Sequence, residues 1–388
     1  MTAAENPLGQ YRQEIDAVDG ELVALLARRK ALVAKVGEVK SIHGLPVYVP
    51  GREKALISAR RAEAQMAGIS PDLIEDILRR IMRESYAAEG DTGFKATAPD
   101  LAPIVVVGGG GGMGALFVEK FRQSNYTVRI LEHDNWPDAP KILAGASLVL
   151  ISVPINITLE VIEKLAPLLS QDSILADVTS IKAMPLRKML SKHSGPVLGL
   201  HPMFGPATGS LAKQLVVYCH GRGESSYQWL LDQCVIWGAS LLEAEPEKHD
   251  HMMGTIQAMR HFATYIYGMH LYREGVDIET VLEFSSPIYR LELAMVGRLF
   301  AQEPALYADI IFSSVEGGEI AERYHHRFEM ELEILRNGDR QSFINRFMEV
   351  KRWFGPHAEG FLKESSFMLE KVYEKFGDRP EKPEEKTP

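Results

Sequence analysis

The first 42 residues carry apolar side chains three and four positions apart, which is the spacing of one helical face. This pattern predicts an amphipathic helix over residues 8–42. The stripe consists of Ile15, Val18, Leu22, Leu25, Leu32, Val33 and Val36. Such a helix would be roughly 50 Å long at 1.5 Å per residue. A module of this size cannot bury the stripe by itself, so we expect the helix to pair with its own copy in a homodimer.

Further helices are predicted at residues 52–67 and from Ser70-Pro71 onward, where Ser is a typical N-cap and Pro fits the first helical position. Residues 1–90 are therefore expected to form an all-α domain. Residues 91–103 contain Gly and Pro without periodicity and are interpreted as a linker.

From residue 104 the pattern changes to short β-branched runs that alternate with helical stretches. The runs lie at 104–107, 127–131, 146–154, 173–178, 197–200 and 216–220, and the last is expected to be the final strand. Residues 104–220 thus predict an α/β domain with a parallel, doubly wound sheet. Residues 221–376 predict a second all-α domain, and the Pro-, Glu- and Lys-rich tail at 377–388 is expected to be disordered.

The first of these runs leads into five consecutive glycines, which contain the spacing Gly109-x-Gly111-x-x-Gly114 with Met113 inside it. In a dinucleotide site the first glycine makes the strand-to-helix turn, the second admits a pyrophosphate, and the third lets helix and strand pack closely. Glu132 follows the next run, 18 residues past Gly114, where an acid binds ribose hydroxyls and repels a 2′-phosphate. This order favours NAD as cofactor over a glycine-rich turn without a ligand.

Ligands of such sheets bind at the carboxyl ends of the strands. That rule places Ser152, Val153 and Pro154 at the cofactor edge, together with residues 179–182, although ordinary loop chemistry would explain them equally well. His201 follows another run and is held between prolines, where it could act as an acid or base beside a nicotinamide. A purely structural histidine is the alternative.

Two basic residues fall inside the N-terminal apolar stripe. At about 100° per residue, Arg29 and Lys40 lie within about 40° of Ile15, with Arg12 on the flank. Arg28 points the opposite way. Long basic side chains can extend from an apolar face to water, but several on one face favour an anion bound between helices.

Composition limits the function further. The net charge of −9 argues against a nucleic-acid partner, and Cys219 and Cys234 have no metal-ligand spacing, which suggests core thiols in a reducing compartment. No apolar run is long enough for a membrane span and the N-terminus has no secretory pattern, so we expect no membrane partner and a cytoplasmic location. The pairs His249/His251 and His325/His326 are interpreted as structural or surface residues, and no metal is expected.

The N-terminal segment carries a spaced set of charged and polar residues, Arg12, Arg29, Lys40, Arg52, Glu53, Ser85 and Glu89. In this spacing it resembles the all-helical type of chorismate mutase. The resemblance implies that arginines bind the substrate carboxylates, with Arg12 reaching into the partner subunit's site, and that Glu53 holds the ring hydroxyl. It implies further that Lys40 and residue 89 contact the ether oxygen.

Two positions depart from that family's pattern. Val49 stands where many members carry Asp, and Glu89 stands where many carry Gln. A glutamic acid can donate a hydrogen bond to the ether oxygen only when it is protonated, which predicts mutase activity that falls at alkaline pH.

The stretch 197–206, Val-Leu-Gly-Leu-His-Pro-Met-Phe-Gly-Pro, resembles a prephenate dehydrogenase signature, and 177–182, Asp-Val-Thr-Ser-Ile-Lys, resembles a second one. The resemblance implies that His201 is the base, that Ser180 orients the substrate hydroxyl beside the cofactor, and that Arg298 binds a substrate carboxylate. His261, Arg290 and Lys182 are further candidates for substrate binding. The order of modules is similar to that of bifunctional chorismate mutase/prephenate dehydrogenases of tyrosine biosynthesis, which are commonly inhibited by tyrosine.

Two other functions remain open from the sequence. One is an NAD-dependent dehydrogenase of another small acid, in which the N-terminal helices serve only for dimerisation. The other is a non-enzymatic sensor of the dinucleotide. The basic residues inside the N-terminal stripe argue against both, because neither function needs Arg29 or Lys40.

Overall fold

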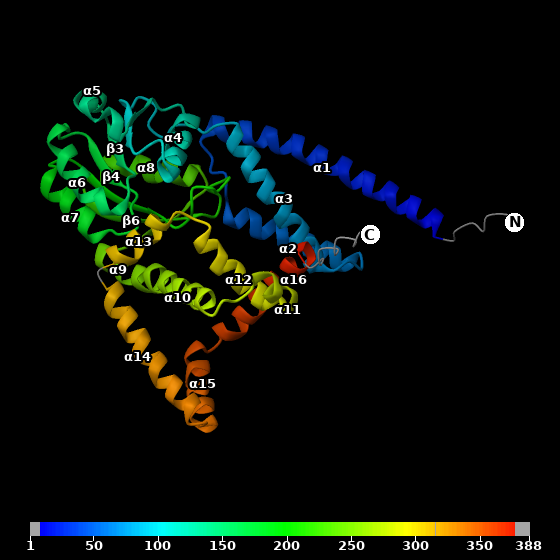
Figure 1. Ribbon diagram of the computed structural model, residues 1–388. Helices are drawn as coiled ribbons and strands as arrows, with labels where there is room; N and C mark the ends of the chain where they lie inside the picture. Colours follow the sequence, from blue (N-terminus) through cyan, green and yellow to red (C-terminus); the bar gives the residue numbers. More distant parts are fainter. Residues whose placement is uncertain (1–7, 315, 377–388) are drawn as a thin grey trace, which may run out of the picture. The chain divides into compact units, whose positions relative to one another are not determined.

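The computed structural model of the protein describes residues 8–314 and 316–376, so the tail expected to be disordered lies outside the described residues. The chain divides between His249 and Asp250 into two compact units. Each unit is described by itself (Figure 1).

The first unit begins with three helices, α1 (Gly9–His43), α2 (Pro50–Met66) and α3 (Pro71–Asp91). Helix α1 ends because Gly44 adopts a left-handed conformation and donates its N–H to the carbonyl of Lys40. Helix α3 begins at the predicted cap, where the Ser70 hydroxyl accepts the Leu73 N–H. The first part of α1 extends beyond α2 and α3 (Figure 1), and its apolar stripe is exposed, with Leu25 59% exposed.

A seven-stranded sheet follows, in the order β2-β1-β3-β4-β5-β6-β7. Strands β1 to β5 are parallel, β6 is antiparallel to β5, and β7 is parallel to β6. The bounds are β1 Ile104–Val107, β2 Val128–Leu131, β3 Leu148–Ile151, β4 Ile174–Asp177, β5 Val197–Pro202, β6 Leu215–Arg222 and β7 Ser240–Glu243. The prediction that the strand at 216–220 is the last was wrong, because β7 pairs with it.

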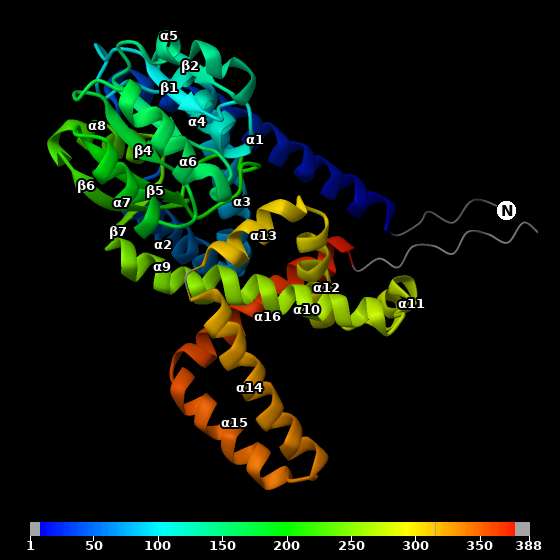
Figure 2. The ribbon, with the colours of Figure 1, turned by 60° about the vertical axis from the view of Figure 1, so that its left-hand side comes forward.

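Helices cover both faces of the sheet, as in a doubly wound fold (Figure 2). One core lies under α4 (Gly112–Gln123) and α8 (Glu224–Ile236), and the other lies under α5 (Ala139–Leu143), α6 (Ile155–Leu165) and α7 (Ala183–Lys192). Alternate residues of each strand enter opposite cores, so Val106 belongs to the first and Val107 to the second. Val47 of the helical module and Phe94 of the linker also belong to the first core, which joins the module to the sheet.

The second unit is helical. Its elements are α9 (Pro246–Met253, which crosses the division), a π-helical turn at Gly254–Met259, α10 (Arg260–Arg273), α11 (Ile278–Phe284), α12 (Pro287–Phe300), α13 (Pro304–Ser313), α14 (Gly317–Arg336), α15 (Arg340–Phe354) and α16 (His357–Phe376). Within the described part of the chain, every helix is too short or too polar to cross a membrane. The fold class expected from the sequence, helical domain, Rossmann domain and helical domain, is confirmed.

Candidate active sites

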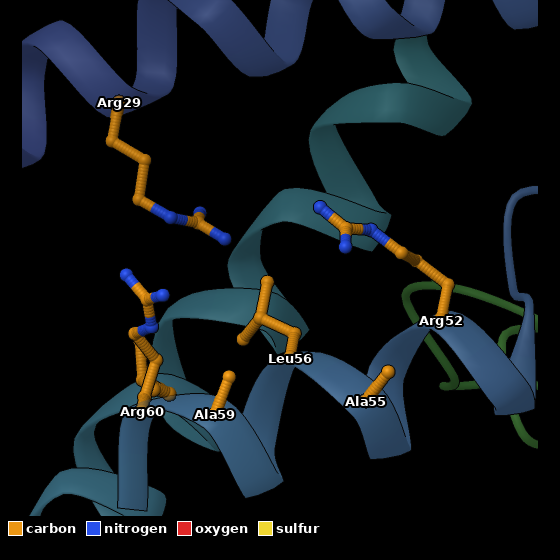
Figure 3. A pocket seen from close by; sticks show the side chains of 7 residues that line it. Arg29, Arg52, Ala55, Leu56, Ala59 and Arg60 are labelled. Carbon is orange, nitrogen blue, oxygen red and sulfur yellow. The ribbon is translucent and has the colours of Figure 1, made fainter. Parts of the chain in front are cut away.

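A pocket of about 340 Å³ opens among the three N-terminal helices. Figure 3 shows the guanidinium groups of Arg29, Arg52 and Arg60 directed toward the same space, with Leu56 between them. Arg29 comes from α1, and the other two come from α2. Three cations around a small pocket suit a ligand with two carboxylates. Arg60 was not identified from the sequence, since its position on α2 carries no motif.

Beside this pocket, two basic side chains of α1 each contact a polar candidate residue of α3. The Arg29 guanidinium donates a hydrogen bond to the Ser85 hydroxyl at 2.7 Å, and the Lys40 ammonium lies 2.7 Å from the Glu89 carboxylate. Lys40 also donates to the carbonyl of Val47 at 2.8 Å. Since Ser85 and Glu89 are buried, these contacts replace the water that the polar groups lose on folding.

Glu53 lies at the first turn of α2 and is only 7% exposed. Its carboxylate accepts hydrogen bonds from Arg79, Tyr86 and Lys213. Of the expected mutase residues, only Arg29 and Arg52 line the pocket. Arg12 lies on the exposed part of α1, and its role in a partner subunit's site stays a prediction, as do the substrate contacts of Lys40, Glu53, Ser85 and Glu89.

The glycine loop after β1 has the geometry that a pyrophosphate site needs. Gly108, rather than the expected Gly109, makes the turn, since it has φ 79° and a Cβ there would lie 2.3 Å from the Ser152 carbonyl oxygen. At Gly114 a Cβ would lie 2.1 Å from the carbonyl oxygen of Gly108, so helix and strand pack closely as predicted. Gly111 precedes the first turn of α4, and a Cβ there would make only an ordinary contact of 3.8 Å with the Gly108 carbonyl oxygen, so an anion can approach the helix N-terminus.

A pocket of about 600 Å³ follows the carboxyl ends of β1, β2 and β3. Of the expected cofactor residues, Gly111, Glu132, Ser152, Val153 and Pro154 line it, whereas Gly109, Met113, Gly114 and Ser180 do not. The Glu132 carboxylate accepts the Gly110 N–H at 2.6 Å and so lies against the glycine loop. Trp136 and Lys164 also line the pocket but follow no motif, which is why they were missed. The glycine-loop backbone, which carries N–H donors and no side chains, fits the phosphates of a dinucleotide.

His201 lies at the carboxyl end of β5 and is 3% exposed. Its Nδ1 lies 2.8 Å from Nε2 of His249, so one ring must donate to the other. Burial, together with the nearby charges of His249 and Lys182, holds the pKa of His201 well below its usual range. His249 is 3% exposed, which agrees with the structural interpretation, but the sequence did not indicate that its ring contacts the candidate base.

Lys182, expected to bind substrate, has a different environment. It is fully buried, and its ammonium donates to the carboxylate of Asp177 and, at 2.8 Å, to the carbonyl of Leu200. The Lys182 ammonium therefore supports the strand end before His201, and its role in substrate binding stays a prediction. Ser180, in the same segment, is partly exposed, and its role beside the substrate hydroxyl stays a prediction.

Three further candidates belong to the second unit. His261 on α10 is 7% exposed and contacts the Arg260 guanidinium at 3.1 Å and the Tyr307 ring edge-on. Burial and the charge of Arg260 lower the pKa of His261 to about 4. Arg298 near the end of α12 is exposed and Arg290 is partly exposed. Their roles in the substrate site stay predictions.

The other histidines hold no metal site. Among residues 8–314 and 316–376, no three His, Cys, Asp or Glu side chains are placed to hold an ion. His251 lies 2.9 Å from the Glu316 carboxylate, and His325 and His326 are exposed. Cys219 and Cys234 are buried and unbridged, as expected.

Three family models match successive parts of the chain. Residues 11–90 match type II chorismate mutase, residues 122–230 match the nucleotide-binding domain of prephenate dehydrogenase, and residues 245–349 match its dimerization domain. In the solved structures, a prephenate dehydrogenase from A. aeolicus in complex with hydroxyphenyl propionate and NAD⁺ is similar in fold. Its TM-score is 0.50 at 17% identity, over 65% of this chain and 96% of that one.

Two curated relatives match over nearly their whole lengths. The T-protein of Enterobacter agglomerans is 54% identical over 93% of this chain and 97% of its own. The T-protein of Haemophilus influenzae is 51% identical over 94% of this chain and 97% of its own. With both enzyme domains present in the same order, the chain belongs to the T-protein family and is a bifunctional chorismate mutase and NAD-dependent prephenate dehydrogenase of tyrosine biosynthesis.

Proposed function

We propose that the arginine-lined pocket among α1, α2 and α3 binds chorismate, with Arg29 and Arg52 on its carboxylates and Glu53 on its ring hydroxyl. The observation that supports this role is the convergence of three guanidinium groups on one small pocket. Lys40 and Glu89 contact the ether oxygen whose bond breaks. The rearrangement is pericyclic and needs no nucleophile, so positioning and charge stabilisation are what the side chains contribute.

Glu89 gives this site a testable pH dependence. In the structure the Lys40 ammonium lies 2.7 Å from Glu89, and a hydrogen bond from Glu89 to the ether oxygen requires the protonated acid. We expect wild-type mutase turnover to fall as the pH rises, and the Glu89→Gln variant to keep its turnover at alkaline pH because an amide donates at any pH. Chorismate loss measured across the pH range tests this. A flat profile for the wild type would remove the proposed role.

In the dehydrogenase, we propose that the His201 pair carries the proton chemistry. His201 donates Nδ1–H to His249, which leaves Nε2 to accept the proton of the prephenate ring hydroxyl while Ser180 orients that hydroxyl. NAD, when bound, accepts the hydride from the same carbon. The ring carboxylate leaves as carbon dioxide, and the phenolate oxygen that results takes the proton back. Arg298 holds a substrate carboxylate, with His261 and Arg290 as further contacts.

Glu132 is proposed to select NAD over NADP. Its carboxylate lies at the end of β2 in the dinucleotide pocket, where a 2′-phosphate would meet a like charge. The Glu132→Gln variant is expected to reduce the preference for NAD by about tenfold or more, because the repulsion is removed. The ratio of kcat/KM for the two cofactors measures this effect. Unchanged discrimination would count against the role.

We propose further that the protein is a homodimer in the cytoplasm and that tyrosine inhibits it at or near the prephenate pocket. The exposed stripe of α1 and the exposed rings of Phe284 and Phe312, 86% and 87% exposed, support self-association. Two buried free thiols suit a reducing compartment. Sedimentation tests the dimer, and a monomer would contradict it. Kinetics with tyrosine and prephenate in competition test the inhibitor site, and non-competitive inhibition would contradict that assignment.

A further inference from the structure

The loop between β5 and β6 brings a lysine of the dehydrogenase domain to the mutase module. Lys213 lies 160 residues after Glu53 in the chain, and its ammonium lies 2.5 Å from Oε1 of the Glu53 carboxylate. The same ammonium lies 5.4 Å from the centre of the Tyr48 ring, in the loop before α2. Lys213 has φ 68°, a left-handed conformation that is uncommon outside glycine.

This position is held by the backbone. The N–H of Lys213 donates to the carbonyl of Gly238 at 3.1 Å, in the turn that follows α8. The carbonyl of Ile236 in that turn accepts the N–H of Val47 at 3.2 Å. Val47 is 3% exposed and belongs to the core shared with the sheet. One turn therefore anchors both the lysine and the loop that leads into the mutase helix α2.

Both oxygens of the carboxylate that Lys213 meets accept hydrogen bonds within the protein. Oε1 of Glu53 accepts from Lys213 and, at 3.0 Å, from Arg79, while Oε2 accepts from the Tyr86 hydroxyl at 2.7 Å. The Arg79 guanidinium also forms an ion pair with Glu75. The groups facing Glu53 are thus Tyr48 from the preceding loop, Arg79 and Tyr86 from α3, and Lys213 from the sheet domain. Such an arrangement fixes the orientation of the carboxylate.

We propose that Lys213 is a positioning residue of the chorismate mutase site, supplied by the dehydrogenase domain, that orients the Glu53 carboxylate for the ring hydroxyl of the substrate. This inference rests on the proposed role of Glu53. Burial by itself raises the pKa of Glu53, but hydrogen bonds from Lys213 and Tyr86 and the charges of Lys213 and Arg79 outweigh it, so the pKa lies below its ordinary value. The mutase then depends on a residue outside its own helices.

The test uses the full-length protein with Lys213→Met, which removes the charge and keeps the stem, and Lys213→Arg, which restores a cation. Lys188→Met serves as the matched control, because Lys188 forms an ion pair with Glu163 on the sheet domain's surface, remote from the mutase helices in sequence. For each protein, kcat and KM for chorismate are measured across the pH range, and prephenate oxidation is measured separately.

We expect Lys213→Met to lower mutase kcat/KM by about tenfold, the low end for a charged hydrogen bond because Lys213 is 41% exposed and partly screened. Removing the cation lets the pKa of Glu53 rise. As the pH is lowered, the variant should therefore lose its mutase activity at a higher pH than the wild type does. Lys213→Arg should restore most of the activity, and prephenate oxidation should match the control.

The proposal is overturned if Lys213→Met has the same mutase kinetics as Lys188→Met at every pH. It is also overturned if Lys213→Met loses mutase activity and prephenate oxidation in equal proportion. The Glu53→Gln variant separates this failure from failure of the proposed site. If Glu53→Gln retains full mutase activity, the role of Glu53 itself is wrong. If it loses activity and Lys213→Met does not, only the positioning role of Lys213 is wrong.

Discussion

Replacing His201 by asparagine is expected to lower the turnover of prephenate oxidation by about 10²- to 10⁴-fold, the range for loss of a general base. The amide of asparagine can still donate toward His249, so the buried pair keeps a hydrogen bond, but it cannot accept the proton of the ring hydroxyl. Binding of prephenate should change little. Stopped-flow measurement of NADH formation, with binding followed separately, gives both quantities.

The same residue predicts the pH dependence. The base must be neutral, and the pKa of His201 is depressed, chiefly by burial, so dehydrogenase turnover should persist as the pH falls through 6.5, the ordinary value for histidine. Turnover should decline only below the depressed pKa, where His201 becomes protonated. Near-normal turnover of His201→Asn would contradict the assignment of the base, and a loss centred on 6.5 in the wild type would contradict its buried environment.

Replacing Arg29 by leucine is expected to lower mutase kcat/KM by about 10²- to 10³-fold, since a substrate carboxylate would lose its charged partner. Leucine suits the apolar stripe of α1, and the Ser85 hydroxyl keeps its hydrogen bond to the carbonyl of Ile81. The fold should therefore tolerate the change better than loss of Lys40, which would leave the buried Glu89 without its cation. Chorismate loss is the readout.

Arg28→Leu is the matched control, because Arg28 is the adjacent residue in the same helix and is exposed. It should keep both activities, and Arg29→Leu should keep prephenate oxidation. If Arg29→Leu retains mutase activity, the arginine-lined pocket does not bind chorismate. The helical module would then act in dimerisation, as one alternative from the sequence holds.

Features encoded by local pattern were predictable from the sequence. The long helix, the Ser70-Pro71 cap, the parallel strands and the glycine loop all depend on residues close together in the chain, and each is confirmed. The sequence also placed Arg29 and Lys40 on one face because helical periodicity determines that geometry. The turn residue was misassigned to Gly109 because five consecutive glycines allow more than one register, and only the backbone shows that Gly108 has positive φ.

Contacts between distant segments were not predictable. His249 lies on a helix whose packing against β5 has no signature in the sequence, so its contact with His201 was missed. Lys213 meets Glu53 only because the turn after α8 anchors both loops. The short β7 was missed because Ser-Leu-Leu-Glu contains no β-branched residue and is largely exposed. The burial of Lys182 against Asp177 likewise has no signature in the sequence.

The most direct test of the account is one assay with the purified protein, chorismate and NAD, in which chorismate loss and NADH formation are followed together. The account predicts that chorismate disappears and that NADH forms without added prephenate, after a lag while prephenate accumulates. Stable chorismate, with NADH formed only when prephenate is added, would contradict the mutase site. Absence of both reactions would contradict the assignment of both sites.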